Sequence, residues 1–424
     1  MRVASRNSML VLLGCLALSG CSRSVDDEQT IRFWAMGREA EVVGELLHEF
    51  ESRNPGIRVE LQQLPWTGAH AKLLTAFAGG STPDMAQLGN TWLPELVALG
   101  ALAPLDSDIA ASSEVRAEDY FPGIFATNRV GDAVYGIPWY VDTRLLFYRR
   151  DLLAVAGFDA PPCNWHEWRQ MMVAIKARAG GKRYAILLPL NEFEPLLALA
   201  LQQDGLLLRE GGRYGNFRSE GFRRVLTFYL DLFRENLAPR ASNTQIANVW
   251  TEFGNGTFAF YLSGPWNIAE FKRRLQPEQQ DDWMTAPLPG PDGPGVSTAG
   301  GASLVVFAAS TRKVAAWRLI EFLSEPDAQR RLHALTGNLP PRRSVWSDQA
   351  LAGDVHAQAF REQLERVKPT PAIPEWERIA TEMQLIAEQA VLTGQDADAA
   401  ATELDRRVDA ILSKRRWLLD RNGQ

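Results

Sequence analysis

Aromatic and acidic side chains are concentrated in residues 135–151, where they could bind a ligand rich in hydroxyl groups. Trp139, Tyr140 and Asp142 bring two amphipathic rings and a carboxylate into four consecutive residues. Aromatic rings pack against the apolar C–H faces of a sugar, and fixed polar groups bind its hydroxyls. A buried polar group left unpaired costs about 1–3 kcal/mol, so such a site rejects a ligand of the wrong shape. The stretch predicts either a carbohydrate-binding edge or an ordinary strand with a turn and a packed tryptophan.

Side chains of the same kinds follow several other predicted strands. The candidates for ligand contact are Glu39, Trp66, Asn90 with Trp92, Tyr140, Asp142, Trp266, and the paired glycines Gly300 and Gly301. In open parallel sheets ligands lie beyond the carboxyl ends of the strands, which is where these residues are expected. Each also has a structural alternative. Trp92 could belong to the core of its helix, and Glu39 could be an ordinary acid at a helix N-terminus.

Sequence patterns typical of catalysis are largely missing. The chain has no GxSxG, HExxH or Walker A sequence. Its five histidines are scattered without ligand-like partners at helical spacing, and Cys163 lies in a Pro-Pro-Cys-Asn turn without a nearby base. We therefore expect no catalytic residues, no metal site and no cofactor.

Two other functions remain open at this point. One is a binding protein for a non-sugar solute, such as a peptide, a polyamine or a metal. The other is a lipid-anchored glycoside hydrolase. It would need two carboxylates about 5–5.5 or 6.5–9.5 Å apart, chosen from Glu39, Glu41, Asp142 and Glu194.

Length and composition indicate a soluble protein with two lobes. The chain has 424 residues, which is more than one hydrophobic core usually serves. Its 46% hydrophobic and 23% charged residues are typical of a globular protein. The formal charge of -6 arises from 45 basic and 51 acidic residues spread along the chain. No basic block suggests nucleic acid, and no acidic tail suggests a disordered segment.

The N-terminus has the features of a secretory signal. Arg2 and Arg6 precede a short apolar run at 9–18, and this run is too short to span a bilayer. The sequence Leu18-Ser19-Gly20-Cys21 resembles the lipobox of bacterial lipoproteins. The resemblance implies a signal peptide at 1–20, a lipid on Cys21 and a polar tether at 21–29. The alternative is a plain signal peptide followed by an incidental cysteine. Cys163 is then the only free thiol, and no internal disulfide can form.

Predicted strands alternate with helices through the first part of the chain. Strands are expected at 30–36, 57–61 and 84–88, and helices at 42–50, 69–77 and 92–99. This alternation is typical of a parallel sheet covered on both faces, so an α/β fold is expected. The pattern restarts after residue 151, with a possible hairpin at 206–217. The end of the chain, about 355–417, is nearly all helix.

Three interruptions divide the chain, at 138–142, 287–301 and 336–343. If each is a crossing between lobes, lobe 1 combines 30–138 with 300–336. Lobe 2 then combines 143–290 with 340–424, including the helical C-terminal segment. A two-lobed α/β protein with three hinge crossings closes on a ligand held between its lobes.

The chain resembles the sugar-specific, maltose-binding-protein-like solute-binding proteins of ABC importers (family 1). Besides the lipobox, the residues that carry this are Phe50-Glu51-Ser52-Arg53-Asn54-Pro55-Gly56, Gly80-Ser81-Thr82-Pro83-Asp84, Tyr135-Gly136-Ile137-Pro138 and Gly264-Pro265-Trp266, among others in the family's order. The resemblance implies two α/β lobes of the periplasmic-binding-protein fold, no catalysis and docking on a membrane permease. It further implies a monomer in the bacterial periplasm or at the cell surface, loaded with a disaccharide or short oligosaccharide.

Binding residues carry over from the family position by position. Glu39, Asn90, Tyr140, Asp142, Trp266 and Gly301 fall where relatives similar to trehalose/maltose binders contact sugar, and Arg343 is a further candidate from the third crossing. Two departures leave the identity of the sugar open. Many relatives have an acid where this chain has Asn90, and many have Trp where this chain has Ala302.

Overall fold

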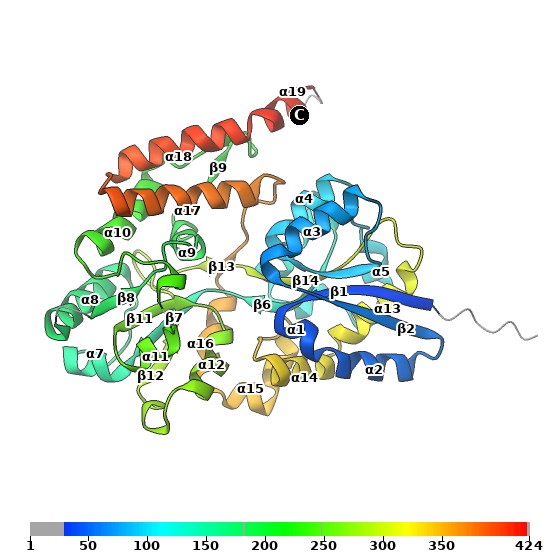
Figure 1. Ribbon diagram of the computed structural model, residues 1–424, viewed down its shortest axis with the longest axis horizontal. Helices are drawn as coiled ribbons and strands as arrows, with labels where there is room; N and C mark the ends of the chain where they lie inside the picture. Colours follow the sequence, from blue (N-terminus) through cyan, green and yellow to red (C-terminus); the bar gives the residue numbers. More distant parts are fainter. Residues whose placement is uncertain (1–28, 181–182, 247, 422–424) are drawn as a thin grey trace, which may run out of the picture.

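The computed structural model describes residues 29–180, 183–246 and 248–421. Its strands form two main sheets, each the centre of one lobe, with helices packed around them (Figure 1). The predicted signal peptide, Cys21 and most of the tether lie outside the described residues. The first strand begins at Gln29, one residue before its expected start. Within the described ranges, no helix is long and apolar enough to cross a membrane.

The sheet of lobe 1 has five strands in the order β2-β1-β3-β14-β6. Their bounds are β1 Gln29–Met36, β2 Ile57–Leu64, β3 Met85–Gly89, β6 Ile137–Asp142 and β14 Gly300–Val306. The first three strands are parallel, as alternation with helices predicts. β14 is antiparallel to both β3 and β6, so the complete sheet is mixed. β14 arrives from lobe 2 instead of following a helix of lobe 1, and nothing in its sequence fixes that direction.

Helices cover both faces of the lobe 1 sheet. They are α1 Gly37–Val42, α2 Gly44–Arg53, α3 Trp66–Ala78, α4 Leu93–Ala98, α5 Asp106–Ala111, α6 Pro122–Ala126, α13 Lys313–Ser324 and α14 Pro326–Thr336, with the 3-10 turns η1 Asn90–Trp92 and η2 Ala117–Asp119. Buried apolar residues of α2, such as Leu46 and Phe50, recur at helical spacing and pack against α13 at Phe322. A small hairpin, β4 Arg129–Val130 with β5 Ala133–Val134, precedes β6.

The sheet of lobe 2 has four strands in the order β12-β7-β11-β8. They are β7 Leu145–Arg149, β8 Tyr184–Leu187, β11 Phe258–Ser263 and β12 Trp283–Ala286. Every residue of β11 is buried, as expected for a strand covered on both faces. Its helices are α7 Arg150–Ala156, α8 Trp165–Ala179, α9 Glu194–Ala200, α10 Glu220–Arg234, α11 Val249–Gly254, α12 Trp266–Arg274, α15 Gln349–Gly353 and α16 Val355–Leu364.

The C-terminal segment is helical and packs on lobe 2. α17 Trp376–Thr393 and α18 Ala397–Ile411 pack against each other and against α10, and α19 Ser413–Arg421 ends the described chain (Figure 1). Figure 1 also shows α17 reaching toward the α3 and α4 side of lobe 1, and α17 contacts η1 there. The predicted hairpin at 206–217 is present as β9 Leu208–Arg209 and β10 Tyr214–Gly215.

The chain passes between the two lobes at three places that lie side by side. The first is the connection from β6 to β7, and the second runs from β13 Ser297–Thr298 into β14. The third is the segment 337–342, whose Leu339 carbonyl accepts a hydrogen bond from the Val141 amide at 3.0 Å. On its other side β6 pairs with β14, where Gly301 lies opposite Val141. β6 is therefore the middle of the three connections.

Candidate ligand-binding site

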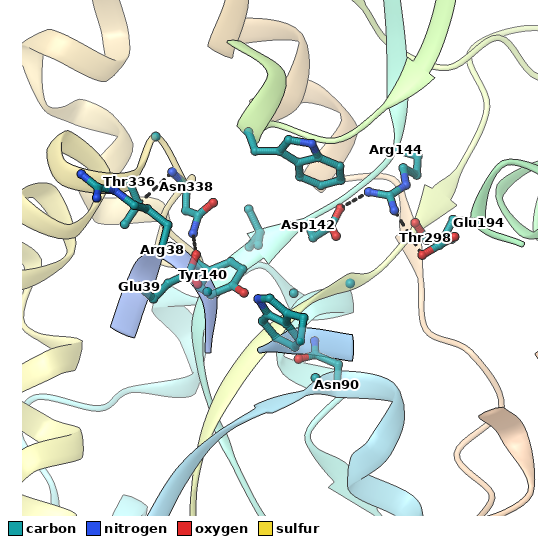
Figure 2. A pocket seen from close by; sticks show the side chains of 18 of the residues that line it. Arg38, Glu39, Asn90, Tyr140, Asp142, Arg144, Glu194, Thr298, Thr336 and Asn338 are labelled. Atoms are coloured by element: carbon teal, nitrogen blue, oxygen red, sulfur yellow. Dashed lines mark hydrogen bonds and ion pairs between the residues drawn. The ribbon is translucent and has the colours of Figure 1, made fainter. Parts of the chain in front are cut away.

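A cavity of about 1320 Å³ lies between the two lobes beside the three connections. Residues of both lobes line it, and Figure 2 draws 18 of them and labels ten. Eight of the nine predicted ligand-binding residues are among the lining residues: Glu39, Trp66, Asn90, Tyr140, Asp142, Trp266, Gly300 and Gly301. The fold thus brings together predicted residues that are as far as 262 positions apart, since Glu39 and Gly301 both line this space.

Backbone geometry explains why paired glycines stand opposite the first crossing. Gly300 pairs with Asp142 across the sheet, and Ala302 pairs with Tyr140. A Cβ atom at Gly300 would lie 2.4 Å from the Asp142 carbonyl oxygen, much closer than real Cβ atoms approach. The strands can approach this closely because neither glycine carries a side chain.

Glu39 and Tyr140 meet in a polar cluster at the lobe 1 side of the cavity. Glu39 is buried in the first turn of α1, and its carboxylate accepts a hydrogen bond from the Asn338 side chain of the third crossing (Figure 2). Gln87, fully buried on β3, donates to the Tyr140 hydroxyl at 3.1 Å. Burial raises the pKa of Glu39, although hydrogen bonds from Asn338 and Gln87 oppose the shift. The cluster fixes one carboxylate and one hydroxyl as hydrogen-bonding groups facing the cavity.

Six aromatic side chains line the cavity: Trp66, Trp92, Tyr140, Phe193, Trp250 and Trp266. On lobe 1, Trp66 packs edge-on against Trp92, with ring centroids 5.6 Å apart. Trp92 is therefore a cavity residue as well as a packing residue of its helix. Trp139, by contrast, is buried behind β6 and packs on Phe33 at 6.1 Å, on the opposite side from the cavity.

Trp266 is the first residue of α12, directly after Gly264 and Pro265. A Cβ atom at Gly264 would lie 1.9 Å from the Trp266 ring, so the ring lies against this part of the backbone. The next residue, Asn267, accepts a hydrogen bond from the Trp250 indole N–H at 2.7 Å and donates to Ser263 at 2.7 Å. The Gly-Pro-Trp sequence thus ends one strand and begins one helix with its aromatic ring at the cavity.

Asp142 belongs to a charged group of three residues on the lobe 2 side. Arg144 Nη1 donates to Asp142 Oδ1 at 2.7 Å, and Arg144 Nη2 lies 3.2 Å from Glu194 Oε1 (Figure 2). The Asp142 side chain keeps 32% of its surface open to the cavity, whereas that of Arg144 keeps 8%. Burial between the lobes raises the pKa of Asp142, and the Arg144 charge opposes the increase.

Asn90 lines the cavity, and its side-chain amide forms hydrogen bonds with other residues of the protein. Its Nδ2 donates to Thr127 Oγ1 at 2.7 Å, and its Oδ1 accepts from Ser303 Oγ at 3.2 Å. A carboxylate at this position could not donate to Thr127 in the same way. Asn90 therefore joins η1 to β14 and to the turn after α6.

Arg343 is the predicted residue that the structure does not bring to the cavity. Its guanidinium pairs with Glu365 and lies 5.5 Å from the centre of the Phe121 ring. The 3-10 turn η5 Arg343–Ser347 begins at this residue and directs the chain away from the cavity. The third crossing contributes Asn338 in its place, and the neighbouring Arg342 is buried in ion pairs with Glu114 and Asp119.

Several cavity residues were missed by the sequence analysis as binding candidates. They are Arg38, Arg144, Phe193, Trp250, Thr298, Asn338 and Glu377, while Glu194 was considered only as a hydrolase carboxylate. Arg144 had a signal, because it lies two residues after Asp142 in an extended segment and so shares its face. Glu377 had none. It lies on α17 and reaches the cavity only because α17 packs across to η1.

Two carboxylates of the cavity share one partner, since Asp142 and Glu194 both pair with the Arg144 guanidinium. A glycosidase instead places two carboxyl groups on either side of the bond that it cleaves. Within the ranges that the structure describes, no group of three or more His, Cys, Asp or Glu side chains could hold a metal ion. Two described histidines contact lining residues: His70 stacks on Trp92 and pairs with Glu95, and His333 hydrogen-bonds with the Asn338 carbonyl.

Residues 35–330 match the family model of the bacterial extracellular solute-binding proteins. The match extends over well over half of the chain and includes both sheets. The chain is a member of this family. The family consists of binding proteins, which agrees with the expectation that this one is not an enzyme. The two-lobed α/β fold, predicted from the sequence, is confirmed by the solved structures that share it.

One solved structure is particularly similar, that of the sugar-binding protein MalE from the phytopathogen Xanthomonas citri. The two chains are 57% identical, the match covers 92% of this chain and 99% of that one, and the TM-score is 0.90. A lipoprotein of Streptomyces antibioticus is 29% identical, over 90% of this chain and 87% of its own. The diacetylchitobiose binding protein DasA of Streptomyces coelicolor is 22% identical, over 92% and 94% of the two chains.

Proposed function

We propose that this solute-binding protein captures a disaccharide or short oligosaccharide and delivers it to an ABC permease. The observation that carries the proposal is the cavity between the lobes, where six aromatic rings face fixed hydrogen-bonding groups. Rings bind the apolar faces of sugars, and carboxylates and amides bind their hydroxyls. The similarity to the sugar-binding MalE of Xanthomonas citri supports a carbohydrate over another solute.

Within this function the binding residues are Glu39, Trp66, Asn90, Tyr140, Asp142, Trp266, Gly300 and Gly301, all of which line the cavity. Tyr140 and Asp142 stand in the middle connection and accept or donate hydrogen bonds to hydroxyls. Trp266 stacks on one sugar ring from lobe 2, and Trp66 bounds the cavity from lobe 1. Residues 30–138 with 300–336 move as one lobe, and residues 143–290 with 340–424 move as the other, closing on the ligand.

We propose the location as well, on the basis of the same family. The protein is exported and lipidated at Cys21, which places the binding lobes in the periplasm or at the cell surface beside the permease. The similarity to a lipoprotein of Streptomyces antibioticus supports the lipid anchor. We also propose that it acts as a monomer, which the lining of the cavity by two lobes of one chain supports.

Isothermal titration of the purified protein against a panel of α- and β-linked disaccharides tests the function. We expect saturable heat from at least one sugar and weaker, still measurable binding in Asp142→Asn. Heat from a peptide or polyamine, with none from any sugar, would refute the proposal. Release of reducing sugar by the wild type, abolished in Asp142→Asn, would instead identify a hydrolase.

A further inference from the structure

Arg144 occupies the first connection between the lobes, after the last residue of β6 and just before the first residue of β7. Its guanidinium spans two carboxylates of the cavity, Asp142 at 2.7 Å and Glu194 at 3.2 Å. The two acids come from different elements, because Glu194 is the first residue of α9. A single arginine therefore joins the connection to the helix that lines the lobe 2 side of the cavity.

The same guanidinium packs on the tryptophan that faces the ligand space. Arg144 Cζ lies 4.7 Å from the centre of the Trp266 ring, which is the distance of a cation–π contact. Its backbone carbonyl accepts a hydrogen bond from Ser297 Oγ at 2.5 Å, so the second connection holds the residue as well. These contacts leave 8% of the side chain exposed and fix its position.

The charges around Asp142 make Arg144 its principal stabilising neighbour. Glu194 and Glu192 also lie near the carboxyl, and the charge of each opposes a negative charge there; the Tyr140 hydroxyl nearby stays neutral. Burial tends to lower the pKa of Arg144, but Asp142 and Glu194 together raise it, and the guanidinium stays charged. Without that charge, Asp142 would stand in a buried group of acids.

We propose that Arg144 is a positioning residue of the ligand site, which holds Asp142 as an ionised hydrogen-bond acceptor and supports the Trp266 ring. The inference rests on the proposed function only in that Asp142 and Trp266 contact the ligand. An ionised carboxylate offers two acceptor oxygens, whereas a protonated one becomes in part a donor. Arg144 therefore decides at which pH the site presents acceptors to a sugar.

The first experiment needs no ligand. Selective ¹³C labelling of aspartate carboxyl groups, with Asp142→Asn to assign the signal, gives the proton affinity of Asp142 by NMR titration of the full chain. When an adjacent positive charge is removed, the proton affinity of a carboxyl group commonly rises tenfold or more. In Arg144→Met we expect the proton affinity of Asp142 to rise at least about tenfold. An unchanged titration would overturn the inference, whatever the protein binds.

The second experiment measures sugar affinity against pH for the wild type and three variants. Arg144→Met should lose affinity as pH falls from 8 toward 5.5, by up to about tenfold per pH unit once Asp142 begins to protonate. Arg144→Lys keeps the charge without the forked geometry, so its profile should stay close to that of the wild type at a lower overall affinity. The double variant Asp142→Asn with Arg144→Met should lose the added pH dependence.

If Arg144 had a structural role alone, Arg144→Met would lower sugar affinity equally at every pH, and that result would overturn the inference.

If Arg144→Met does not fold, Glu194→Gln provides the second variant. Removing this carboxylate relieves a like charge near Asp142, so the proton affinity of Asp142 should fall, and an increase would contradict the arrangement. Failure of the proposed function is distinguishable, because it would show as no sugar binding while the NMR titration still reports the Arg144–Asp142 pair.

Discussion

The backbone of Gly301 passes so close to Tyr140 that a Cβ atom on the glycine would lie 2.2 Å from the Tyr140 carbonyl oxygen. The φ angle of Gly301 is +137°, a conformation that residues with side chains rarely adopt. The second crossing can therefore pack against the first only with glycine at this position. Because Tyr140 and Asp142 lie on that first crossing, the geometry of the cavity depends on the absence of a side chain.

Replacing Gly301 with alanine should destabilise the protein by about 2–3 kcal/mol, since it adds both a close contact and an unfavourable φ. Unfolding in urea measures the change in free energy. Gly293 is the matched control, because a Cβ atom there would meet nothing within 4 Å. Equal stability of Gly301→Ala and Gly293→Ala would contradict this account of the crossing.

Much of this arrangement could be predicted from the sequence. The run of Pro and Gly at 287–301 interrupts periodic segments, and the second connection between the lobes lies there. Pro138, by contrast, lies inside β6, and the first connection follows that strand at 143–144. Trp266 follows a Gly-Pro pair after a predicted strand, and its ring does lie at the cavity. Local signals of this kind are reliable because they act within a few residues of the side chain that they position.

Other features depended on contacts between distant segments, which no local pattern records. The direction of β14 follows from its arrival out of lobe 2, and Arg343 turns away because η5 begins there. Glu377 reaches the cavity because an 18-residue helix packs across to lobe 1. Periodicity identified that helix and its buried face, but it could not indicate which lobe would lie opposite its first turn.

Trp266 should report ligand binding directly. Its ring packs on Arg144 and lines the cavity, so a stacked sugar would change its surroundings and shift its fluorescence. In Trp266→Ala we expect the shift to disappear and sugar affinity to fall about 30-fold, which corresponds to about 2 kcal/mol. Trp417→Ala is the control, because that side chain is 54% exposed on α19 and does not line the cavity. A full fluorescence shift in Trp266→Ala would place the sugar elsewhere.

The cavity should discriminate against acidic sugars. Each arginine that lines it is already paired with a carboxylate: Arg38 with Glu41, Arg144 with Asp142 and Glu194, and Arg273 and Arg274 with Glu270. An incoming anion would meet Glu39 and Asp142 without a cation of its own, and an unpaired buried charge is costly.

Titration calorimetry with a neutral disaccharide and its uronic acid analogue tests this selectivity. We expect the acidic analogue to bind at least about tenfold more weakly, or by about 1.4 kcal/mol. The difference in affinity between the neutral and the acidic sugar should be smaller in Asp142→Asn, because this variant removes one of the repelling charges. Equal affinity for the two sugars in the wild type would show that a cavity arginine exchanges its partner for the ligand.

The carboxyl of Glu377 should reduce stability at neutral pH. Burial raises its pKa, the Thr91 side chain and His70 oppose the increase, and Glu194 and Glu95 add to it. A carboxyl with a raised pKa binds its proton more tightly in the folded state than in the unfolded state. Stability is therefore fully present below the ordinary glutamate pKa and falls as pH rises through the folded pKa.

Glu377→Gln removes this titration while keeping the shape of the side chain. Its free energy of unfolding should equal that of the wild type near pH 4 and exceed it at pH 7 by about 1 kcal/mol or less. Urea unfolding at the two pH values measures the difference. Glu382→Gln is the control on the same helix, and it should lose stability at pH 7 because it breaks the 3.0 Å pair with Arg407. If Glu377→Gln were also less stable at pH 7, the ionised Glu377 would be a favourable contact between the lobes.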